Sequence, residues 1–487
     1  MRPIKFYTFI NILVLLYLLY LYTTAGSSYN YSLCISCICI CLCEACIVIF
    51  NNSDLNRVII RPTSILIISL LIVFVQSYID LVLGNFAPTY NAFRFPETIN
   101  RAIIISAIAF TSFSITYIQS HHFRLSTQQQ EPEALLNTKL KIITIINVIS
   151  FAWWLSSLSS DFLSGAAYID SGKYNEGHTS YPELVYKIST YVALIIFIKS
   201  LATTNDITMS KFFRRMPKLI LYPILIYILF LVMSGDRGNA IYTIFALFFG
   251  YTFTTKAKVR LWVFIPLLIL GAFIMTSLSF GRQMGDELTF AEKLTYVSDN
   301  QDDLKDANEI MESFSPFTSE LAHSSSCTHI ALYNLENNKD RLSYGQFTLC
   351  YLLQIIPIIG TEIINSLGIP IEERSTSEYI TVTTSGKFYE SGFGTNVIAD
   401  LYLDYRLIGV IIGFLIMGFL CKKIDYNYIH ASHNNISWRM LALIIFIGAT
   451  AIVIPRSYLL YHVRTFIYII FLYTIISKCA LFSNKNY

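Results

Sequence analysis

Long apolar runs separated by short polar connections fill most of the chain, and this pattern predicts membrane-spanning helices. A hydrocarbon core of ~30 Å takes about twenty helical residues to cross. The runs that approach this length cover residues 4–23, 33–50, 63–83, 101–118, 140–158, 184–201, 218–233, 240–254, 261–280, 396–420, 440–460 and 464–480. We therefore expect an all-α polytopic membrane protein with about twelve transmembrane helices.

Composition supports this class. The chain has 487 residues, of which 54% are hydrophobic and only 14% are charged. Such an apolar balance in a chain of this length excludes a soluble enzyme. The net charge of +3 is small, and we expect no nucleic-acid partner.

The charges are distributed unevenly along the chain. Residues 281–395 hold seven Lys and Arg against seventeen Asp and Glu, whereas the remainder holds twenty-eight against fifteen. We expect 1–280 to carry the first nine helices, 281–395 to form one large acidic outer loop, and 396–487 to carry the last three helices. Within the loop, Phe347–Gly360 is apolar but too short to span, which fits a re-entrant or interfacial element over the membrane domain.

The positive charges predict the orientation. If the chain starts in the cytoplasm, the inner segments collect twenty Lys and Arg, whereas the short outer connections hold seven. The positive-inside rule then places both termini in the cytoplasm. The acidic loop and the turn between the runs 218–233 and 240–254 would both lie outside, on the periplasmic side.

That turn carries the first candidate for ligand binding. It reads Ser234-Gly235-Asp236-Arg237-Gly238-Asn239 and joins two runs short enough to place it below the membrane surface. A charge at such depth usually faces a protein interior or a wet cavity, so Arg237 is expected to bind an anion. The glycines on both sides permit the close backbone approach that a phosphate needs. The alternative is a surface hairpin in which Asp236 and Arg237 neutralise each other.

Four arginines fall at predicted outer helix ends, namely Arg237, Arg282, Arg456 and Arg464. Because guanidinium groups bind phosphate oxygens in a bidentate manner, the set suggests a site for a phosphorylated or pyrophosphorylated lipid. We expect at least three of them to point into one outward-opening cavity, with Asp236 or Asp400 within reach. The alternative is four separate anchors at the membrane interface.

Two groups of possible metal ligands are interpreted as structural. Six of the ten cysteines crowd into Leu33–Phe50, but their spacing fits no paired C-x-x-C set, and thiols in an apolar helix behave as small hydrophobes. His323, Cys327 and His329 lack a fourth ligand, so we expect no metal site. Glu44, in the cysteine-rich run, either pairs inside the bundle or leans toward the inner interface, and the sequence leaves both open.

Three features together resemble a known family. They are the Ser-Gly-Asp-Arg-Gly turn after an apolar helix, the single large outer loop late in the chain, and the segment Gly392–Tyr405 leading into the glycine-bearing helix Gly409–Gly418. The combination resembles the bacterial O-antigen or capsule repeat-unit polymerases of the Wzy type.

The resemblance implies an inverting, metal-independent glycosyltransferase of the bacterial inner membrane that needs no cofactor. A glycan on undecaprenyl pyrophosphate would be moved, at the outer face, onto the nonreducing hydroxyl of an incoming lipid-linked repeat unit. The products would be O-antigen, capsular or exopolysaccharide. Membrane lipid, a chain-length regulator and a flippase are the implied partners.

The chemistry of such a transfer identifies candidate catalytic residues. A pyrophosphate leaving group needs its developing charge stabilised, which arginines can do without a metal. The acceptor hydroxyl needs a positioned base. Asp236, Asp400, Glu390 and His462 are the candidates, and the sequence does not rank them.

Two other classes share some of these features. A flippase or transporter of lipid-linked oligosaccharides would have a similar number of helices, but it is expected to show internal repeats and short loops. A polysaccharide ligase would share the outer arginines and would differ from a polymerase in its acceptor. Sugar, linkage and oligomeric state leave no mark that we can identify in the sequence.

Overall fold

The structure is a computed structural model, and it describes residues 3–50, 60–90, 92–119, 123–128, 130–158, 180–201, 208–234, 237–256, 313, 315–337, 343–386 and 393–485. Helices account for all of the regular secondary structure in these ranges, apart from one isolated β-bridge between Thr127 and Ile436. The long helices are α1 (Pro3–Thr24), α2 (Tyr31–Phe50), α3 (Pro62–Leu83), α4 (Ile99–Ile118), α5 (Glu133–Ser156), α8 (Ser180–Ser200), α10 (Lys218–Ser234), α11 (Arg237–Thr255), α20 (Val397–His430), α21 (Trp438–Thr450) and α22 (Leu459–Lys485).

The predicted all-α polytopic class is confirmed, but the number twelve is not. Within the described ranges, eight helices are long and apolar enough to cross a membrane. A ninth span results if the short helix α9 (Met209–Arg215) and α10, which meet at a bend of 112°, count as one. The predicted run 261–280 lies outside the described residues, and the run 440–460 is an α-helix only as far as Thr450; the other ten runs fall on a helix. The polar start of α11 and the 13-residue length of α21 keep these two helices below the criteria for a span.

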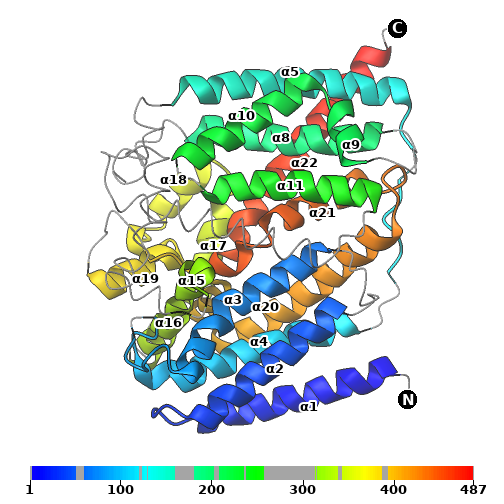
Figure 1. Cartoon of the computed structure of the whole chain (residues 1–487). Coiled ribbons are helices and arrows are strands. Elements are labelled where there is room, and N and C mark those ends of the chain that lie inside the picture. The colour runs from blue at the N-terminus through cyan, green and yellow to red at the C-terminus, as the bar shows by residue number, and fades with distance from the viewer. Residues whose placement is uncertain are drawn as a thin grey trace, which may run out of the picture.

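The helices form a bundle with two distinct ends (Figure 1). Both termini lie at one end. The short helices α15 (Pro316–Ala322), α16 (Ser326–Asn337), α17 (Gln346–Leu353), α18 (Ile359–Ser366) and α19 (Thr376–Ser385) gather at the other. We call this second end the capped end. The described part of 281–395 therefore lies at the end opposite the termini, while the side of the membrane that each end faces stays a prediction.

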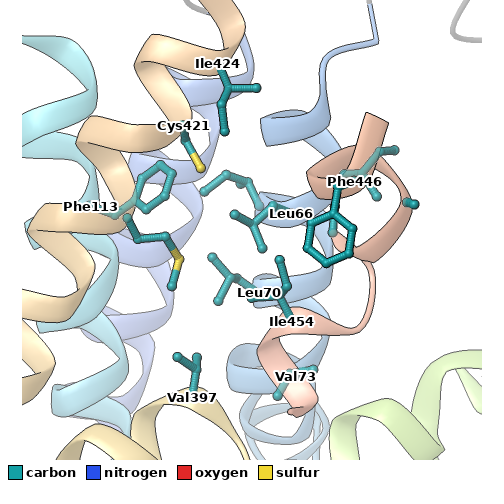
Figure 2. Close-up of a cluster of buried hydrophobic side chains, with 14 of the residues drawn as sticks. Leu66, Leu70, Val73, Phe113, Val397, Cys421, Ile424, Phe446 and Ile454 are labelled. Atoms are coloured by element: carbon teal, nitrogen blue, oxygen red, sulfur yellow. The ribbon is translucent and has the colours of Figure 1, made fainter. Parts of the chain in front are cut away.

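The core joins the two halves of the bundle through α3. Figure 2 shows Leu66 and Leu70 of α3 meeting Phe113 of α4, Cys421 of α20 and Phe446 of α21. All of these side chains are buried. Burial of a large aliphatic or aromatic side chain stabilises by roughly 1.5–3 kcal/mol in water, and within lipid the same close contacts act through van der Waals packing.

A glycine lets α20 and α4 approach each other closely. A Cβ atom added at Gly418 would lie 2.2 Å from the carbonyl oxygen of Phe113, a distance that no side chain can occupy. Small residues at helix contacts in membranes allow such approach and favour association through packing. The glycine-bearing run noted in the sequence is therefore a packing surface.

The cysteine-rich helix α2 is structural, as predicted. Cys34, Cys37 and Cys41 are buried at helical spacing, and none of the cysteines in the described ranges forms a disulfide. Glu44 is also buried and accepts a hydrogen bond from Asn11 Nδ2 of α1 at 3.1 Å. Of the two alternatives for Glu44, pairing inside the bundle is the one observed.

The apolar element Phe347–Gly360 is a pair of short helices and not a span. The chain bends between α17 and α18, and Leu352, Ile356 and Ile359 are exposed. Asp404 of α20 anchors the start of α17, because its carboxylate accepts hydrogen bonds from the Thr348 amide at 2.9 Å and from the Thr348 hydroxyl at 2.6 Å. A docked helix pair with exposed apolar side chains is the form expected of an interfacial element.

Reporter fusions will test the orientation. A reporter placed after Arg260 is expected to report the cytoplasm, and one placed near Asn300 is expected to report the outside, because the positive charges collect at the end that carries the termini. Both positions lie outside the described residues. The reverse pattern at either position would place the capped end in the cytoplasm and rule out the site assignment below.

Candidate active site

A cavity of about 260 Å³ lies between α8, α10, α11, α21 and α22, where α11 and α22 begin. Polar and aromatic side chains line much of it, among them Lys187, Asn239, Tyr242, Tyr461 and His462. It lies toward the capped end, since the segment just before α22 contacts α17: the rings of Tyr458 and Tyr351 stack at 3.7 Å. We call it the turn cavity.

The turn identified in the sequence opens onto this cavity. Helix α10 ends at Ser234 and α11 begins at Arg237, so only two residues connect them. Gly238 and Asn239, in the first turn of α11, line the cavity. Asp236 and the side chain of Arg237 lie outside what the structure describes. The backbone therefore brings the turn to the cavity, while the direction of the Arg237 guanidinium stays a prediction.

A network of polar side chains holds the start of α11 against α8. Glu183 Oε1 accepts hydrogen bonds from Tyr227 Oη at 2.7 Å and from Asn239 Nδ2 at 3.0 Å. Lys187 Nζ donates to Asn239 Oδ1 at 2.9 Å and lies 3.7 Å from Glu183. Glu183 is only 8% exposed, so its charge is balanced inside the protein by Lys187. The network fixes Asn239, which lies two positions after Arg237.

This network gives a testable prediction. Replacing Asn239 with alanine is expected to lower polymerisation about 10- to 100-fold, because a small displacement of a binding group has effects of that size. Asn147→Ala is the matched control, since Asn147 is a buried amide that joins α5 to Ser189 and Thr190 of α8 without touching α11. Polymer length distributions and membrane protein levels should be measured together. An equal loss of polymerisation in both variants would show that the network contributes only to the stability of the protein.

His462 lies in the wall of the turn cavity. It is 6% exposed, and its Nε2 lies 2.7 Å from the hydroxyl of Ser457. That hydroxyl also donates to the carbonyl oxygen of Val453 at 3.1 Å. In the tautomer in which the Ser457 hydroxyl donates to Val453, the imidazole proton lies on Nε2 and Nδ1 is an acceptor. Nδ1 has no hydrogen-bond partner in the described part of the chain.

The two described arginines of the predicted set do not line the turn cavity, and only Arg464 contacts a residue that does. Arg464 places its guanidinium 5.2 Å from the ring of Tyr461, which does line the cavity, and its Nε is buried without a hydrogen-bond partner in the described chain. Arg456 is exposed in the short 3-10 helix η6 (Ile454–Arg456). Arg282 lies outside the described residues, so the expected gathering of at least three arginines stays a prediction.

Asp400 lies in a separate buried position at the start of α20. It is 2% exposed, accepts hydrogen bonds from the hydroxyls of Thr376 and Thr395, and keeps Oδ2 without a partner in the described ranges. Burial raises the pKa of Cys327 to about 12, the charge of Asp400 adds to this, and Arg456 opposes it. Asp400 and Arg456 therefore share one neighbourhood.

Tyr351 connects the two neighbourhoods. Burial raises the pKa of its hydroxyl, and the charge of Asp400 adds to the effect, with a smaller contribution from Tyr461. Tyr461 lines the turn cavity, whereas Asp400 is not part of the cavity wall. Of the four candidate bases, His462 is the one found in the wall, whereas Asp236 and Glu390 lie outside the described residues.

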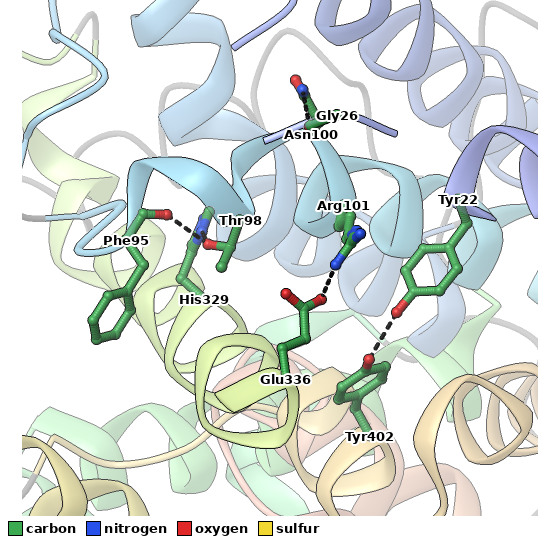
Figure 3. A network of polar contacts seen from close by, with 9 residues as sticks. All are labelled: Tyr22, Gly26, Phe95, Thr98, Asn100, Arg101, His329, Glu336 and Tyr402. Carbon is green, nitrogen blue, oxygen red and sulfur yellow. Dashed lines mark hydrogen bonds and ion pairs between the residues drawn. The ribbon is translucent and has the colours of Figure 1, made fainter. Parts of the chain in front are cut away.

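His329, one of the three possible metal ligands considered in the sequence, lies in a buried hydrogen-bonded position. Its Nε2 lies 2.9 Å from Tyr78 Oη and its Nδ1 lies 2.7 Å from Thr98 Oγ1, so both ring nitrogens are occupied (Figure 3). Burial lowers the pKa of His329 to about 3, which keeps the ring neutral. No group of three potential metal-binding side chains occurs within the described ranges.

The network around Glu183 was not predicted from the sequence. The available signal was a pair of opposite charges one helical turn apart, Glu183 and Lys187, at the start of an apolar run. Charges at that place were interpreted only as part of an outer connection. Their partners, Tyr227 and Asn239, come from two other helices and carry no mark in the local pattern.

A bundle of apolar helices with a polar cavity between them defines an integral membrane protein with a site for a polar ligand. A family model described as O-antigen polysaccharide polymerase Wzy matches residues 5–486, nearly the whole length. The chain belongs to this family, which polymerises O-antigen from lipid-linked oligosaccharide repeat units. No curated protein and no solved structure matches the chain. The resemblance seen in the sequence is thereby confirmed.

Proposed function

We propose that the protein polymerises undecaprenyl-pyrophosphate-linked repeat units at the outer face of the bacterial inner membrane, with the capped end outside and both termini in the cytoplasm. The donor is the growing glycan, and its pyrophosphate lies at the turn cavity beside the start of α11. The acceptor is the nonreducing hydroxyl of an incoming repeat unit. The product is O-antigen, capsular or exopolysaccharide.

One observation carries this proposal: the Ser-Gly-Asp-Arg-Gly turn and His462, more than 220 residues apart in the sequence, meet at one cavity. The first supplies the candidate phosphate-binding arginine, and the second supplies a base with an unoccupied nitrogen. A glycosyl transfer from a pyrophosphate needs both.

The reaction is a single displacement. The acceptor oxygen attacks the anomeric carbon of the donor while the bond from that carbon to the pyrophosphate oxygen breaks. The acceptor's proton passes to Nδ1 of His462, and the electron pair leaves with undecaprenyl pyrophosphate. Attack opposite the leaving group inverts the anomeric centre. Arg237, with Arg282, Arg456 and Arg464 as further candidates, stabilises the charge that develops on the pyrophosphate, so a metal ion is not required.

Asp400 has a different role in this scheme. Its carboxylate ties Thr376, the first residue of α19, and Thr395, just before α20, to the first turn of α20. It therefore positions α19 against the start of α20 and contacts no substrate. Asp236 remains a second candidate for the base.

Reconstitution of the purified protein tests the proposal. In nanodiscs supplied with the lipid-linked repeat unit alone, a polymerase will produce a ladder of longer lipid-linked glycans. A ligase will produce no ladder and will transfer glycan only when a lipid core acceptor is added. A flippase will move the substrate across a bilayer and leave its length unchanged. A ladder that forms without a second protein supports the proposal, and either of the other outcomes replaces it.

A further inference from the structure

A second cavity, of about 410 Å³, lies at the capped end on the other side of the bundle. It is lined by Arg101 of α4, Leu335 and Glu336 of α16, and Tyr402 and Arg406 of α20. Figure 3 shows its surroundings, with Tyr22 of α1 directed at Tyr402. The two hydroxyls lie 2.7 Å apart. This cavity shares no lining residue with the turn cavity, and we call it the α20 cavity.

The α20 cavity carries an uncompensated positive charge. Arg101 forms an ion pair with Glu336, in which both side chains are about one-third exposed. Arg406 is exposed and has no hydrogen bond or ion pair within the described ranges. One guanidinium group is thus neutralised and the other is available to an anion, in a cavity large enough for a pyrophosphate with its first sugar.

The backbone at Arg406 is held in a strained conformation. Its φ of 53° and ψ of −150° interrupt α20, in a region that side chains other than glycine rarely adopt. Two contacts with the segment at the start of α17 hold the turn of α20 that precedes Arg406. The Ser343 amide donates to the Leu403 carbonyl at 3.3 Å, and Asp404 caps α17. Strain of this kind persists where the surroundings fix it and clusters at ligand-binding sites.

The surface beyond Arg406 suits a lipid chain. Ile408, Ile412 and Ile416 follow it along α20 at four-residue spacing from one to the next, and they are 68%, 51% and 54% exposed. A row of exposed isoleucines on a membrane helix faces lipid. A ligand with an anionic head and a long apolar tail could place its head in the α20 cavity and its tail along this row.

The proposed reaction requires a second site for such a ligand. The bond that breaks adjoins the donor's pyrophosphate, whereas the acceptor reacts through the far, nonreducing end of its repeat unit. The acceptor's own pyrophosphate must therefore lie one oligosaccharide length away from the donor's. The two cavities are built by different helices: α8, α10, α11, α21 and α22 line the turn cavity, whereas α4, α16 and α20 line the α20 cavity.

We propose that the α20 cavity, through Arg406 and the Arg101–Glu336 pair, binds the pyrophosphate of the acceptor lipid-linked repeat unit. This inference rests on the function proposed above and adds a separate acceptor subsite. It makes Arg406 a binding residue that takes no part in breaking the glycosidic bond.

A comparison of two acceptors tests the subsite. Wild-type protein in phosphatidylcholine nanodiscs is given one lipid-linked donor and, as acceptor, either the repeat unit on a pyrophosphoryl-prenyl anchor or the same oligosaccharide on a neutral alkyl chain. The acceptor KM should be about tenfold lower with the pyrophosphate, as expected for a charge-assisted contact. In Arg406→Gln this advantage should disappear, whereas Arg439→Gln should keep it.

Two further variants separate charge from backbone strain. Arg406→Gly removes the guanidinium and relaxes the backbone, so it should lose the same advantage as Arg406→Gln. Arg439→Gln is the control, because Arg439 is an exposed arginine at the start of α21, at the end that carries the termini.

The outcomes distinguish this inference from the function on which it rests. Absence of transfer by wild-type protein with both acceptors would contradict the proposed function. If the wild type transfers glycan but Arg406→Gln prefers the pyrophosphate acceptor as strongly as the wild type does, the acceptor subsite is contradicted and the proposed function is not. The α20 cavity could instead hold an anionic phospholipid. In that case Arg406→Gln will still prefer the pyrophosphate acceptor, and added phosphatidylglycerol will inhibit transfer by the wild type but not by Arg406→Gln. This result would also overturn the proposal. Inorganic pyrophosphate should compete with the prenyl-linked acceptor in wild type and not in Arg406→Gln.

Discussion

Replacement of Arg237 with alanine is expected to abolish polymerisation while the protein remains in the membrane. The substitution removes the positive charge at the start of α11, beside Gly238 and Asn239 in the wall of the turn cavity, without adding bulk. Loss of a preorganised group that stabilises a leaving group typically costs a factor of about 10²–10³ in rate. The measurement is the length distribution of polymer in a strain that carries the variant as its sole polymerase, with membrane protein quantified in parallel.

Arg237→Lys refines this test. A lysine keeps the charge but cannot form a bidentate contact, so activity should return only in part. Arg439→Ala, which alters an exposed arginine at the opposite end, should leave the ladder unchanged. Full activity in Arg237→Ala would show that this arginine is an anchor at the membrane interface.

His462→Ala is expected to lower the transfer rate by a factor of about 10²–10⁴, the usual contribution of a general base. Ser457→Ala should have a smaller effect, because it removes only the group that holds the imidazole proton on Nε2. In a purified assay both variants should lower kcat more than they raise KM for either substrate, since the base acts in the transition state.

A matched histidine provides the control for this experiment. His430 is exposed at the C-terminal end of α20, its ring lies 4.8 Å from that of Tyr426 in a tilted arrangement, and it does not line the turn cavity. His430→Ala should therefore retain wild-type kcat. An unchanged kcat in His462→Ala would transfer the role of base to Asp236, the other candidate that adjoins the turn.

The membrane helices could be predicted from the sequence because the solvent imposes one requirement on all of them. Backbone groups in hydrocarbon must be paired within the segment, so an apolar run of sufficient length becomes a helix. The same reasoning identified Phe347–Gly360 as too short to span, and the structure divides this region into α17 and α18. The exact number of spans could not be predicted, because helices such as α11 combine a polar start with an apolar body.

The site could be predicted only in part. The turn at Arg237 and the residue His462 stood out because charged and titratable groups are rare near apolar runs. Their meeting at one cavity depends on how α11 packs against α21 and α22, and no local pattern carries that information. Asp400 has the same chemical signal in the sequence as a catalytic acid, and only the structure shows that Thr376 and Thr395 both donate to one of its carboxylate oxygens.

Arg406 shows a second limit of reasoning from local patterns. The sequence around it continues an apolar helix, and nothing in the pattern indicates a positive φ. The break depends on Asp404 and the segment before α17, which lies about sixty residues earlier in the chain. Tertiary contacts of this kind override local helix propensity.

Photo-crosslinking tests most directly whether the turn cavity holds the donor's pyrophosphate-linked end. A benzoylphenylalanine is placed at Tyr242, in the cavity wall, or at Leu229, which is exposed on α10, and each protein is irradiated with radiolabelled undecaprenyl-pyrophosphate-linked glycan. We predict labelling at Tyr242 that excess unlabelled substrate abolishes, and at most uncompeted labelling at Leu229. The opposite result would be labelling at Leu229 that unlabelled substrate abolishes and no labelling at Tyr242, in proteins that still polymerise. It would contradict the assignment of the turn cavity as the active site.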